Sequence, residues 1–257
     1  MITDFLAAGT PRLHFSSAES ARFGMTVARL SVPVTEQVGT SQLDEIFERS
    51  AADLVVLRCE TQSPEIGKWL ANLDSWRHLH ADTLLYFSRQ LDDVPSDGEQ
   101  DLRGDVVDQA LLHELAAVTF ASYRNHYSSN PRLPQSAVRD GYSEWLSTLL
   151  SDTATRAFIV DEAGTYVSFV VASELPSLKS GEIVLNGTHP DHESRGHYSR
   201  LVERTLRSFK STGAEKVWIS TQASNRRVIR AWIRLGFNFE HAFDTYHLTP
   251  KSSAHGT

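Results

Sequence analysis

The first hundred residues alternate short apolar runs with segments whose apolar side chains recur every three or four positions. The continuous apolar run at 53–60 is typical of a buried strand. The spacing of Ile66, Trp69 and Leu73 places these side chains on one helix face. This alternation predicts an α/β arrangement. The predicted strands span 22–32, 53–60 and 81–89, and the predicted helices span 40–51 and 64–75.

An acidic segment at 90–105, with Pro, Gly and Ser and few apolar residues, interrupts this pattern. Such composition is typical of a linker. We therefore predict an N-terminal α/β domain at 1–103, a second domain at 104–251 and a tail at 252–257.

The second half begins with helical patterns and continues with strands. Two β-rich runs around "DEAG" predict a hairpin over 155–175. The amphipathic segment 197–212 is followed by Gly213, a residue that often ends helices. The other predicted helices span 108–123, 139–151 and 225–236, and the other predicted strands span 182–188, 216–222 and 239–249.

The composition is that of an ordinary globular protein, with 40% hydrophobic and 22% charged residues in 257. No run reaches the roughly 18 apolar residues that a membrane span needs. The first residues lack the basic-then-apolar order of a secretion signal. The single cysteine, Cys59, cannot form an internal disulfide. We therefore expect a cytoplasmic protein without a membrane partner.

Charge is distributed unevenly along the chain. The net charge of −7 counts against nucleic acid as the main partner. Residues 189–234 nevertheless carry ten Lys and Arg against four acids, a local charge of +6. This basic segment indicates either an anionic ligand or solvated helix faces, and the count alone leaves both open.

The stretch "GTHPDHESRGHYSRL" (187–201) leads from a strand through a glycine-containing loop into a helix. A helix N-terminus offers unpaired N–H groups and partial positive charge to an anion. Gly196 permits close backbone approach, Arg195 and Arg200 add charge, and Ser199 adds a hydroxyl. The stretch therefore predicts a diphosphate site, with a tight turn carrying surface arginines as the plainer alternative.

The order of these elements, with "HPDHESRGHYSRL" and then "NRRVIRAWIRLGF", resembles the GCN5-related N-acetyltransferase (GNAT) family. The resemblance covers 104–250. It implies a mixed, mostly antiparallel sheet flanked by helices, and acetyl-CoA or another acyl-CoA as co-substrate without a metal. The whole chain is more loosely similar to the TDP-fucosamine acetyltransferase subgroup, which acylates the amino group of a nucleotide-linked sugar.

The resemblance also implies a set of cofactor contacts. Three positions depart from the family pattern. Glu193 replaces the favoured Arg or Gln, Tyr198 replaces the favoured Gly or Ala, and Trp232 replaces a tyrosine that protonates the leaving thiolate. An indole N–H donates a hydrogen bond but is not a usable acid. The implied cofactor contacts are Leu185, Gly187, Thr188, Arg195, Gly196, His197, Tyr198, Ser199, Arg200, Asn225 and Trp232.

The expected reaction is direct attack of an amine on the thioester, which needs a base and an N–H donor for the oxyanion. The strand at 182–188 would supply this donor around Leu185–Gly187, where the glycine is consistent with a local irregularity. Tyr246 or Tyr198 could replace the missing acid. The base stays open among Glu182, Asn186, His189 and His247.

An acceptor site is expected under "RNHYSSNPRLP" (124–134), where Arg124, His126, Tyr127 and Arg132 suit an anionic nucleotide sugar. An exposed loop is the alternative. The first hundred residues are expected to pack on this acceptor side. The predicted function is N-acylation of a TDP-type amino sugar. Another small amine, an antibiotic, a protein N-terminus and a non-catalytic acyl-CoA sensor stay open, as does homodimerisation.

Overall fold

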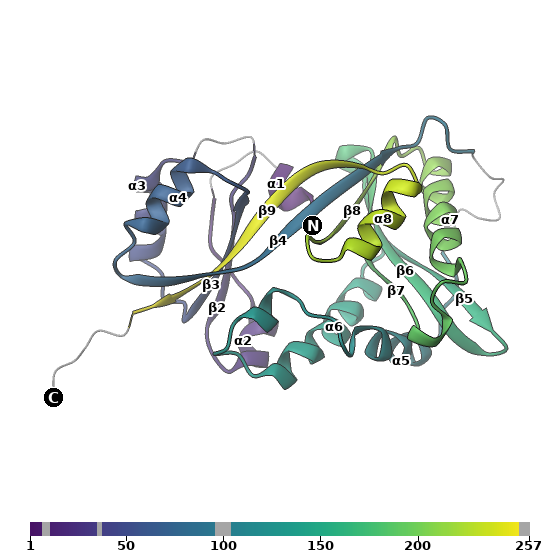
Figure 1. The fold of residues 1–257 in the computed structure, drawn as a ribbon, viewed down its shortest axis with the longest axis horizontal. Coiled ribbons are helices and arrows are strands. Elements are labelled where there is room, and N and C mark those ends of the chain that lie inside the picture. Colours follow the sequence, from purple (N-terminus) through teal and green to yellow (C-terminus); the bar gives the residue numbers. More distant parts are fainter. Residues whose placement is uncertain (7–10, 35–37, 96–103, 252–257) are drawn as a thin grey trace. The chain divides into compact units, whose positions relative to one another are not determined.

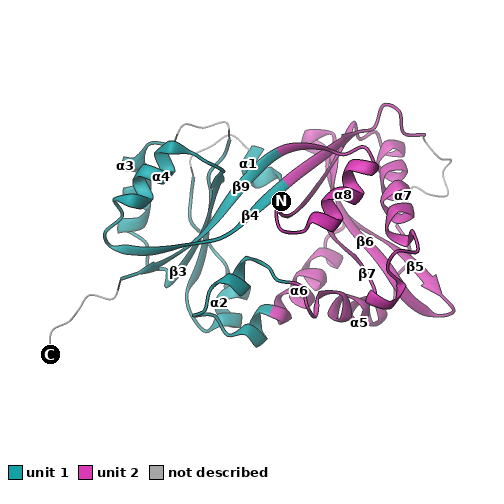
Figure 2. Ribbon diagram, in the orientation of Figure 1, with its two compact units in different colours: residues 1–85, 124–138, 241–257 teal, residues 86–123, 139–240 magenta. Residues whose placement is uncertain are grey.

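The computed structural model describes residues 1–6, 11–34, 38–95 and 104–251 of the chain (Figure 1). The chain divides into two compact units, each gathering segments that are far apart in sequence (Figure 2). Unit 1 comprises Met1–Leu85, Arg124–Val138 and His241–Thr257, and unit 2 comprises Tyr86–Tyr123 and Arg139–Glu240.

Unit 1 is a small α/β layer with strand order β1-β2-β3-β9-β4. Strands β2 and β3 are parallel, whereas β1 and β9 run antiparallel to their neighbours β2 and β3. Its strands are β1 (His14–Phe15), β2 (Val27–Ser31) and β3 (Leu54–Glu60), with parts of β4 (Trp76–Gln90) and β9 (Asn238–Pro250). Its helices are α1 (Thr3–Leu6), α2 (Ser17–Phe23), α3 (Thr40–Glu48), α4 (Pro64–Ala71) and the 3-10 helix η2 (His126–Ser129).

Helices α3 and α4 follow the predicted apolar spacing. Ser63 caps α4 by accepting a hydrogen bond from the backbone N–H of Ile66, and proline occupies the first turn. The ring of Phe47 packs 4.9 Å from Trp69 and 5.1 Å from Trp76, measured between centroids. These three rings pack together in the apolar core between the two helices and the sheet.

A buried polar chain crosses unit 1. Asn130 Nδ2 donates to His247 Nδ1 at 3.1 Å, and His247 Nε2 lies 2.9 Å from His126 Nδ1. Beside it, Glu19 accepts hydrogen bonds from Arg29 and Tyr127. Burial, with the nearby Arg58 charge as a second cause, lowers the pKa of His247 to about 4 and that of His126 well below its usual value.

Unit 2 contains the strand order β4-β8-β7-β6-β5 and most of the helices that the second half of the sequence predicts. Strand β6 is buried along nearly its whole length, and α5 and α7 both contact it. The strands are β5 (Thr155–Glu162), β6 (Thr165–Leu175), β7 (Ser180–Thr188) and β8 (Lys216–Gln222). The helices are α5 (Gln109–Phe120), α6 (Gln135–Leu150), α7 (His197–Ser211), α8 (Arg226–Arg234), η3 (Pro176–Leu178) and η4 (Pro190–His192).

The expected α/β fold with a mixed, mostly antiparallel sheet is confirmed. One predicted strand was too long: its first residues, 22–23, end helix α2. Ser16 caps that helix, and Gly24 ends it with a φ of 63°, so β2 begins only at Val27. None of the described helices has the length and apolar character that crossing a bilayer requires.

The two units are not the two consecutive domains expected from the sequence. Segments 124–138 and 241–257 belong to unit 1, because the long strands β4 and β9 and helix α6 each continue from one unit into the other. Residues 96–103 of the predicted linker and the tail 252–257 lie outside the described residues.

The end of the predicted linker packs against β5 in unit 2. The carboxylate of Asp105 accepts bonds of 2.8 and 2.9 Å from the guanidinium of Arg204, and one of 2.8 Å from the backbone N–H of Ile159. A Cβ on Gly104 would lie only 2.7 Å from the carbonyl oxygen of Ala157. Residues 104–105 are therefore part of the packed unit.

The buried histidines predict a pH-dependent stability. Because the folded state holds His247 neutral down to about pH 4, the unfolded chain binds more protons between about pH 4 and 6.5. The free energy of unfolding, measured by denaturant titration, should therefore fall by about 2 kcal/mol between pH 7.5 and pH 5 because of this group. His247→Gln should flatten this slope, whereas His14→Gln, at an exposed position of β1, should not. Equal slopes in both variants would contradict the assignment.

Candidate functional site

Strands β7 and β8 stop pairing halfway along their length. Their parallel register runs from Ser180↔Lys216 to Ile183↔Ile219, whereas β7 continues to Thr188. At this point the register of β7 against β6 shifts, with Leu185 opposite Val171 and Ile183 opposite Ala172. Val184 is thus the extra residue of a β-bulge, which bends a strand. Beyond it, the edge of β7 that faced β8 has no strand partner in the described register.

The hydrogen-bond alternation decides which backbone groups occupy that edge. The N–H of His189 donates to the carbonyl of Val167 at 2.8 Å. Since antiparallel pairs alternate, Leu185 and Gly187 direct their N–H groups toward β6, and Asn186 and Thr188 direct theirs away from it. Within the expected range Leu185–Gly187, the N–H available to an oxyanion is therefore that of Asn186.

Packing explains why residue 187 is a glycine, and the sequence alone did not reveal this reason. A Cβ at this position would lie 2.4 Å from Thr119 Cγ2 on α5 and 3.4 Å from the ring of Phe169. The expected irregularity is at Val184, and the glycine instead lets α5 approach the free end of β7.

The loop from Pro190 to Gly196 leads into an uncapped helix start. Gly196, the N-cap of α7, adopts a φ of 81°, and no side chain caps this helix. A Cβ on Gly196 would meet nothing within 4 Å, so the space beside this residue is open. Glycine is favoured here by the positive φ angle and not by crowding. The first intrahelical bond here runs from the N–H of Arg200 to the carbonyl of Gly196 at 3.2 Å, which leaves the preceding amides without intrahelical partners.

The side chains around this helix start divide into two groups. Arg195 and Arg200 are exposed and Ser199 is half-buried, so these three can reach a ligand. His197 is buried, and its Nδ1 accepts a hydrogen bond of 2.9 Å from Arg200 Nη2. The hydroxyl of Tyr198 accepts one of 2.6 Å from Trp232. His197 and Tyr198 therefore offer a ligand their backbone amides rather than their side chains.

Trp232 lies in the core of unit 2. It is 1% exposed, its ring packs 5.6 Å from that of Phe87, and its N–H is engaged by Tyr198. The resemblance to the family implies a direct contact between this residue and the cofactor. The indole of Trp232 is instead buried on the inner face of α8. Burial raises the pKa of Tyr198, which makes its phenol a weaker acid at neutral pH.

A polar cluster that the sequence analysis missed lies at the C-terminal end of β8. Tyr123 donates to the side-chain oxygen of Gln222, and its hydroxyl lies 3.4 Å from Thr221 Oγ1. Asn225 Nδ2 donates to the same Thr221 oxygen at 3.1 Å, and it makes no capping bond to α8. The signal that could have identified the cluster is the polar run "STQASN" directly after the apolar residues of a strand.

Residues 116–237 of this chain match the acetyltransferase (GNAT) family. The matched segment makes up just under half of the chain. It is 28% identical over 151 residues to mycothiol acetyltransferase from Propionibacterium freudenreichii, covering 57% of this chain and 46% of the relative. It is 24% identical over 149 residues to the spore coat polysaccharide biosynthesis protein SpsD from Bacillus subtilis, covering 57% and 50%. The chain thus spans about half the length of the curated relatives it matches.

Solved structures share the GNAT fold at low sequence identity. A GCN5-related N-acetyltransferase from Sphaerobacter thermophilus aligns over 86% of this chain and 72% of its own, with a TM-score of 0.58 and 15% identity. A GNAT-family protein from Novosphingobium aromaticivorans aligns over 87% and 84%, with a TM-score of 0.54 and 18% identity. These likenesses support the fold and nothing more specific.

The expected catalytic side chains are dispersed. Glu182 is 2% exposed in the paired part of β7, opposite Ser173 and Trp218. His189 caps η4, since its Nδ1 accepts a 3.2 Å hydrogen bond from the N–H of Asp191. Among these candidates, Asn186 alone lies on the free edge of β7 with a partly exposed side chain.

Tyr246 and His247 lie on β9 in unit 1. Burial, with Asp244 as the next cause, raises the pKa of Tyr246. The ring of His80 packs 5.2 Å from that of Tyr246, edge to face, and His247 belongs to the buried chain described above. Tyr246 thus has the packing partner expected of a strand residue.

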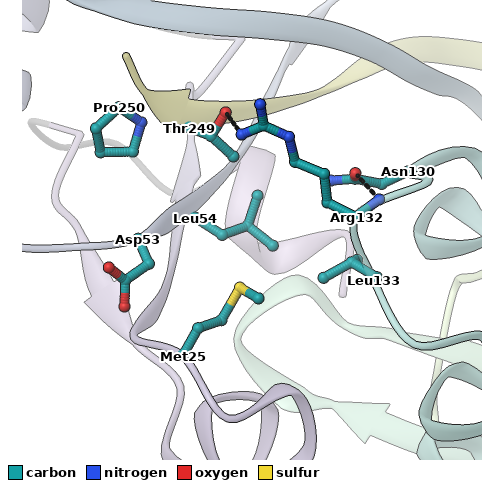
Figure 3. Close-up of a pocket in the computed structure, with 8 residues that line it drawn as sticks. All are labelled: Met25, Asp53, Leu54, Asn130, Arg132, Leu133, Thr249 and Pro250. Carbon is teal, nitrogen blue, oxygen red and sulfur yellow. Dashed lines mark hydrogen bonds between the residues drawn. The ribbon is translucent and has the colours of Figure 1, made fainter. Parts of the chain in front are cut away.

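The four expected acceptor-binding residues do not form one surface. His126 and Tyr127 are 6% and 4% exposed and belong to the buried polar network of unit 1. Arg124 is exposed. Arg132 lines a pocket of about 260 Å³, where its Nη1 donates to Thr249 Oγ1 at 3.3 Å (Figure 3). The pocket is also lined by Met25, Asp53, Leu54, Asn130, Leu133 and Pro250.

The contact between α5 and β7 predicts the behaviour of a glycine variant. Gly187→Ala should destabilise the domain by about 1–3 kcal/mol, because its Cβ overlaps Thr119 Cγ2. The second change Thr119→Ser removes that methyl group and should recover most of the loss, as measured by denaturant unfolding of both single variants and the double variant. Strictly additive effects would argue against this contact.

Proposed function

We propose that this protein is an acyl-CoA-dependent N-acyltransferase that moves an acetyl or short acyl group to the amino group of a nucleotide-linked amino sugar. One observation carries the proposal: the unpaired edge of β7 and the uncapped start of α7 follow each other in one GNAT domain. Together they offer hydrogen-bond donors to a thioester and to a diphosphate.

Two parts of the cofactor, the diphosphate and the amide-rich arm, have matching partners in the domain. The start of α7 suits the diphosphate, because its first amides lack helical partners and Arg195 and Arg200 add positive charge. The amide-rich arm of coenzyme A suits the free edge of β7, where Thr188 directs its N–H and C=O away from β6. This arrangement would bring the thioester carbonyl toward the N–H of Asn186.

The proposed reaction is a direct transfer. The neutral amine attacks the thioester carbon and a C–N bond forms. The nitrogen loses one proton, the C–S bond breaks, and the thiolate takes up one proton. The N–H of Asn186 would stabilise the oxyanion, so the chemistry calls for no metal. Most of the acceleration would come from holding both substrates in line.

The acceptor class is the finer part of the proposal. It is supported by the similarity to a protein named for polysaccharide biosynthesis and to a small-molecule acetyltransferase. The guanidinium of Arg132, in a pocket that is also lined by apolar side chains and by the carboxylate of Asp53, suits an acceptor with an anionic group. The expected cytoplasmic location and homodimer stay predictions.

The deciding experiment measures thiol release from acetyl-CoA with TDP-linked amino sugars, and with the matching free amino sugars as controls. Turnover with the nucleotide-linked sugars alone supports the full proposal. Equal turnover with both keeps the transferase and removes the nucleotide requirement. Binding of acetyl-CoA without turnover on any amine would indicate a sensor instead.

Arg195 tests the diphosphate site. Arg195→Ala should weaken CoA binding about tenfold by calorimetry, because one charge-assisted contact is lost. Binding of pantetheine, which lacks the diphosphate, should stay the same. Arg230→Ala, an exposed arginine on α8, is the matched control and should leave both affinities unchanged. If the two variants weaken CoA equally, a general charge effect is the better explanation.

Arg132 tests the acceptor assignment. Arg132→Ala should raise the KM for an anionic acceptor about tenfold and leave the KM for acetyl-CoA unchanged. Arg77→Ala, which removes an exposed arginine of β4, serves as the control. An unchanged acceptor KM in the Arg132 variant would remove the pocket from the proposal.

A further inference from the structure

The carboxylate of Glu162, at the end of β5, faces three side chains in the segment that runs from η4 into the first turn of α7. Glu162 Oε1 lies 3.1 Å from His197 Nε2, and Glu162 Oε2 lies 3.1 Å from His192 Nδ1. Arg195 Nη1 is 3.8 Å from the same Oε2. These partners come from η4, from the loop and from the first turn of α7, so one side chain touches the segment at three successive points.

The proton on His197 can be assigned from its neighbours. A guanidinium only donates, so the bond from Arg200 requires an unprotonated Nδ1 and places the ring proton on Nε2. That nitrogen is buried and has no well-aligned hydrogen-bond partner among the described residues, but it faces the carboxylate of Glu162. The contact is therefore an electrostatic attraction between an N–H and a carboxylate.

This assignment decides between two roles for the cluster. The donor atoms of Glu162, His192 and His197 lie within 4.8 Å of one another, which would also suit a metal ion. A metal needs the lone pair of Nε2, which the proton occupies while Arg200 binds Nδ1. The geometry therefore favours the carboxylate of Glu162, rather than a metal ion, as the partner of His197 Nε2.

We propose that Glu162 is a positioning residue, which fixes the loop so that the first amides of α7 are preorganised for the diphosphate of the cofactor. This rests on the proposed function. The backbone that carries this carboxylate is fixed by strand pairing, because Glu162 pairs with Thr165 next to the tight turn of the β5–β6 hairpin. The helix it meets is held to the same hairpin, since Asp105 binds both Arg204 of α7 and the N–H of Ile159.

A positioning role and a purely electrostatic role predict opposite changes in the Kd for CoA when the carboxylate is removed. A negative charge beside Arg195 repels a diphosphate, so its removal alone should tighten cofactor binding. Loss of the loop's geometry should weaken binding, because displacing binding groups by about an ångström costs far more than one screened surface charge. The sign of the change in Kd therefore separates the two.

The test compares CoA binding by calorimetry in the full chain and in three variants. Glu162→Ala should raise the Kd about tenfold, whereas Glu162→Gln, whose amide oxygen still faces the N–H of His197, should stay within about threefold of the original protein. The KM for acetyl-CoA should follow the Kd, with kcat at saturation unchanged. Glu174→Ala, which breaks an ion pair with Arg156 on the same hairpin, should have no effect on either.

The outcomes distinguish the two levels of the proposal. If the original protein does not bind CoA, the proposed function fails and this inference fails with it. If it binds CoA but Glu162→Ala binds as tightly or more tightly, or Glu174→Ala weakens binding equally, only the positioning role is overturned. Thermal unfolding with zinc chloride should show no stabilisation, and a zinc-dependent rise that Glu162→Ala abolishes would overturn the proton assignment.

Discussion

The bulge at Val184 is the constraint on which the candidate site in unit 2 depends. A parallel pair that continued past Ile183 would satisfy the edge of β7 with β8 and leave no donors for a ligand. Because the extra residue bends β7 away, the backbone groups of Asn186 and Thr188 lose that strand partner. Helix α5 then supports the bent end, and this support is close enough to require glycine at 187.

Several cations of the basic segment 189–234 have structural partners. Arg204 binds Asp105, Arg227 binds Glu193, and Lys216 lies 3.4 Å from Glu240. Glu193 therefore takes part in joining the loop to α8, in addition to removing positive charge from the loop. The cations that stay exposed at the helix start are Arg195 and Arg200, so the ligand-facing charge is far smaller than the segment's net +6 suggests.

Local patterns predicted local structure well. Apolar spacing identified α3, α4 and α7, and the glycine-containing stretch identified the helix start that Gly196 forms. The sequence could not show which distant segments share a unit, because strand pairing joins residues as far apart as Leu57 and Tyr246. For the same reason, His126 was predicted as a ligand contact although it is buried against His247.

The pair of Trp232 and Tyr198 bears on the proton that the leaving thiolate needs in the proposed reaction. The indole donates to the phenol, and burial raises the pKa of Tyr198, so this pair is a poor acid. The phenol of Tyr123 already donates to Gln222 at the end of β8. A thiol with a pKa near 8.5 is a good leaving group that needs little protonation in the transition state. A site that relies on holding its substrates in line therefore tolerates tryptophan at 232, provided that the loop and the edge of β7 stay fixed.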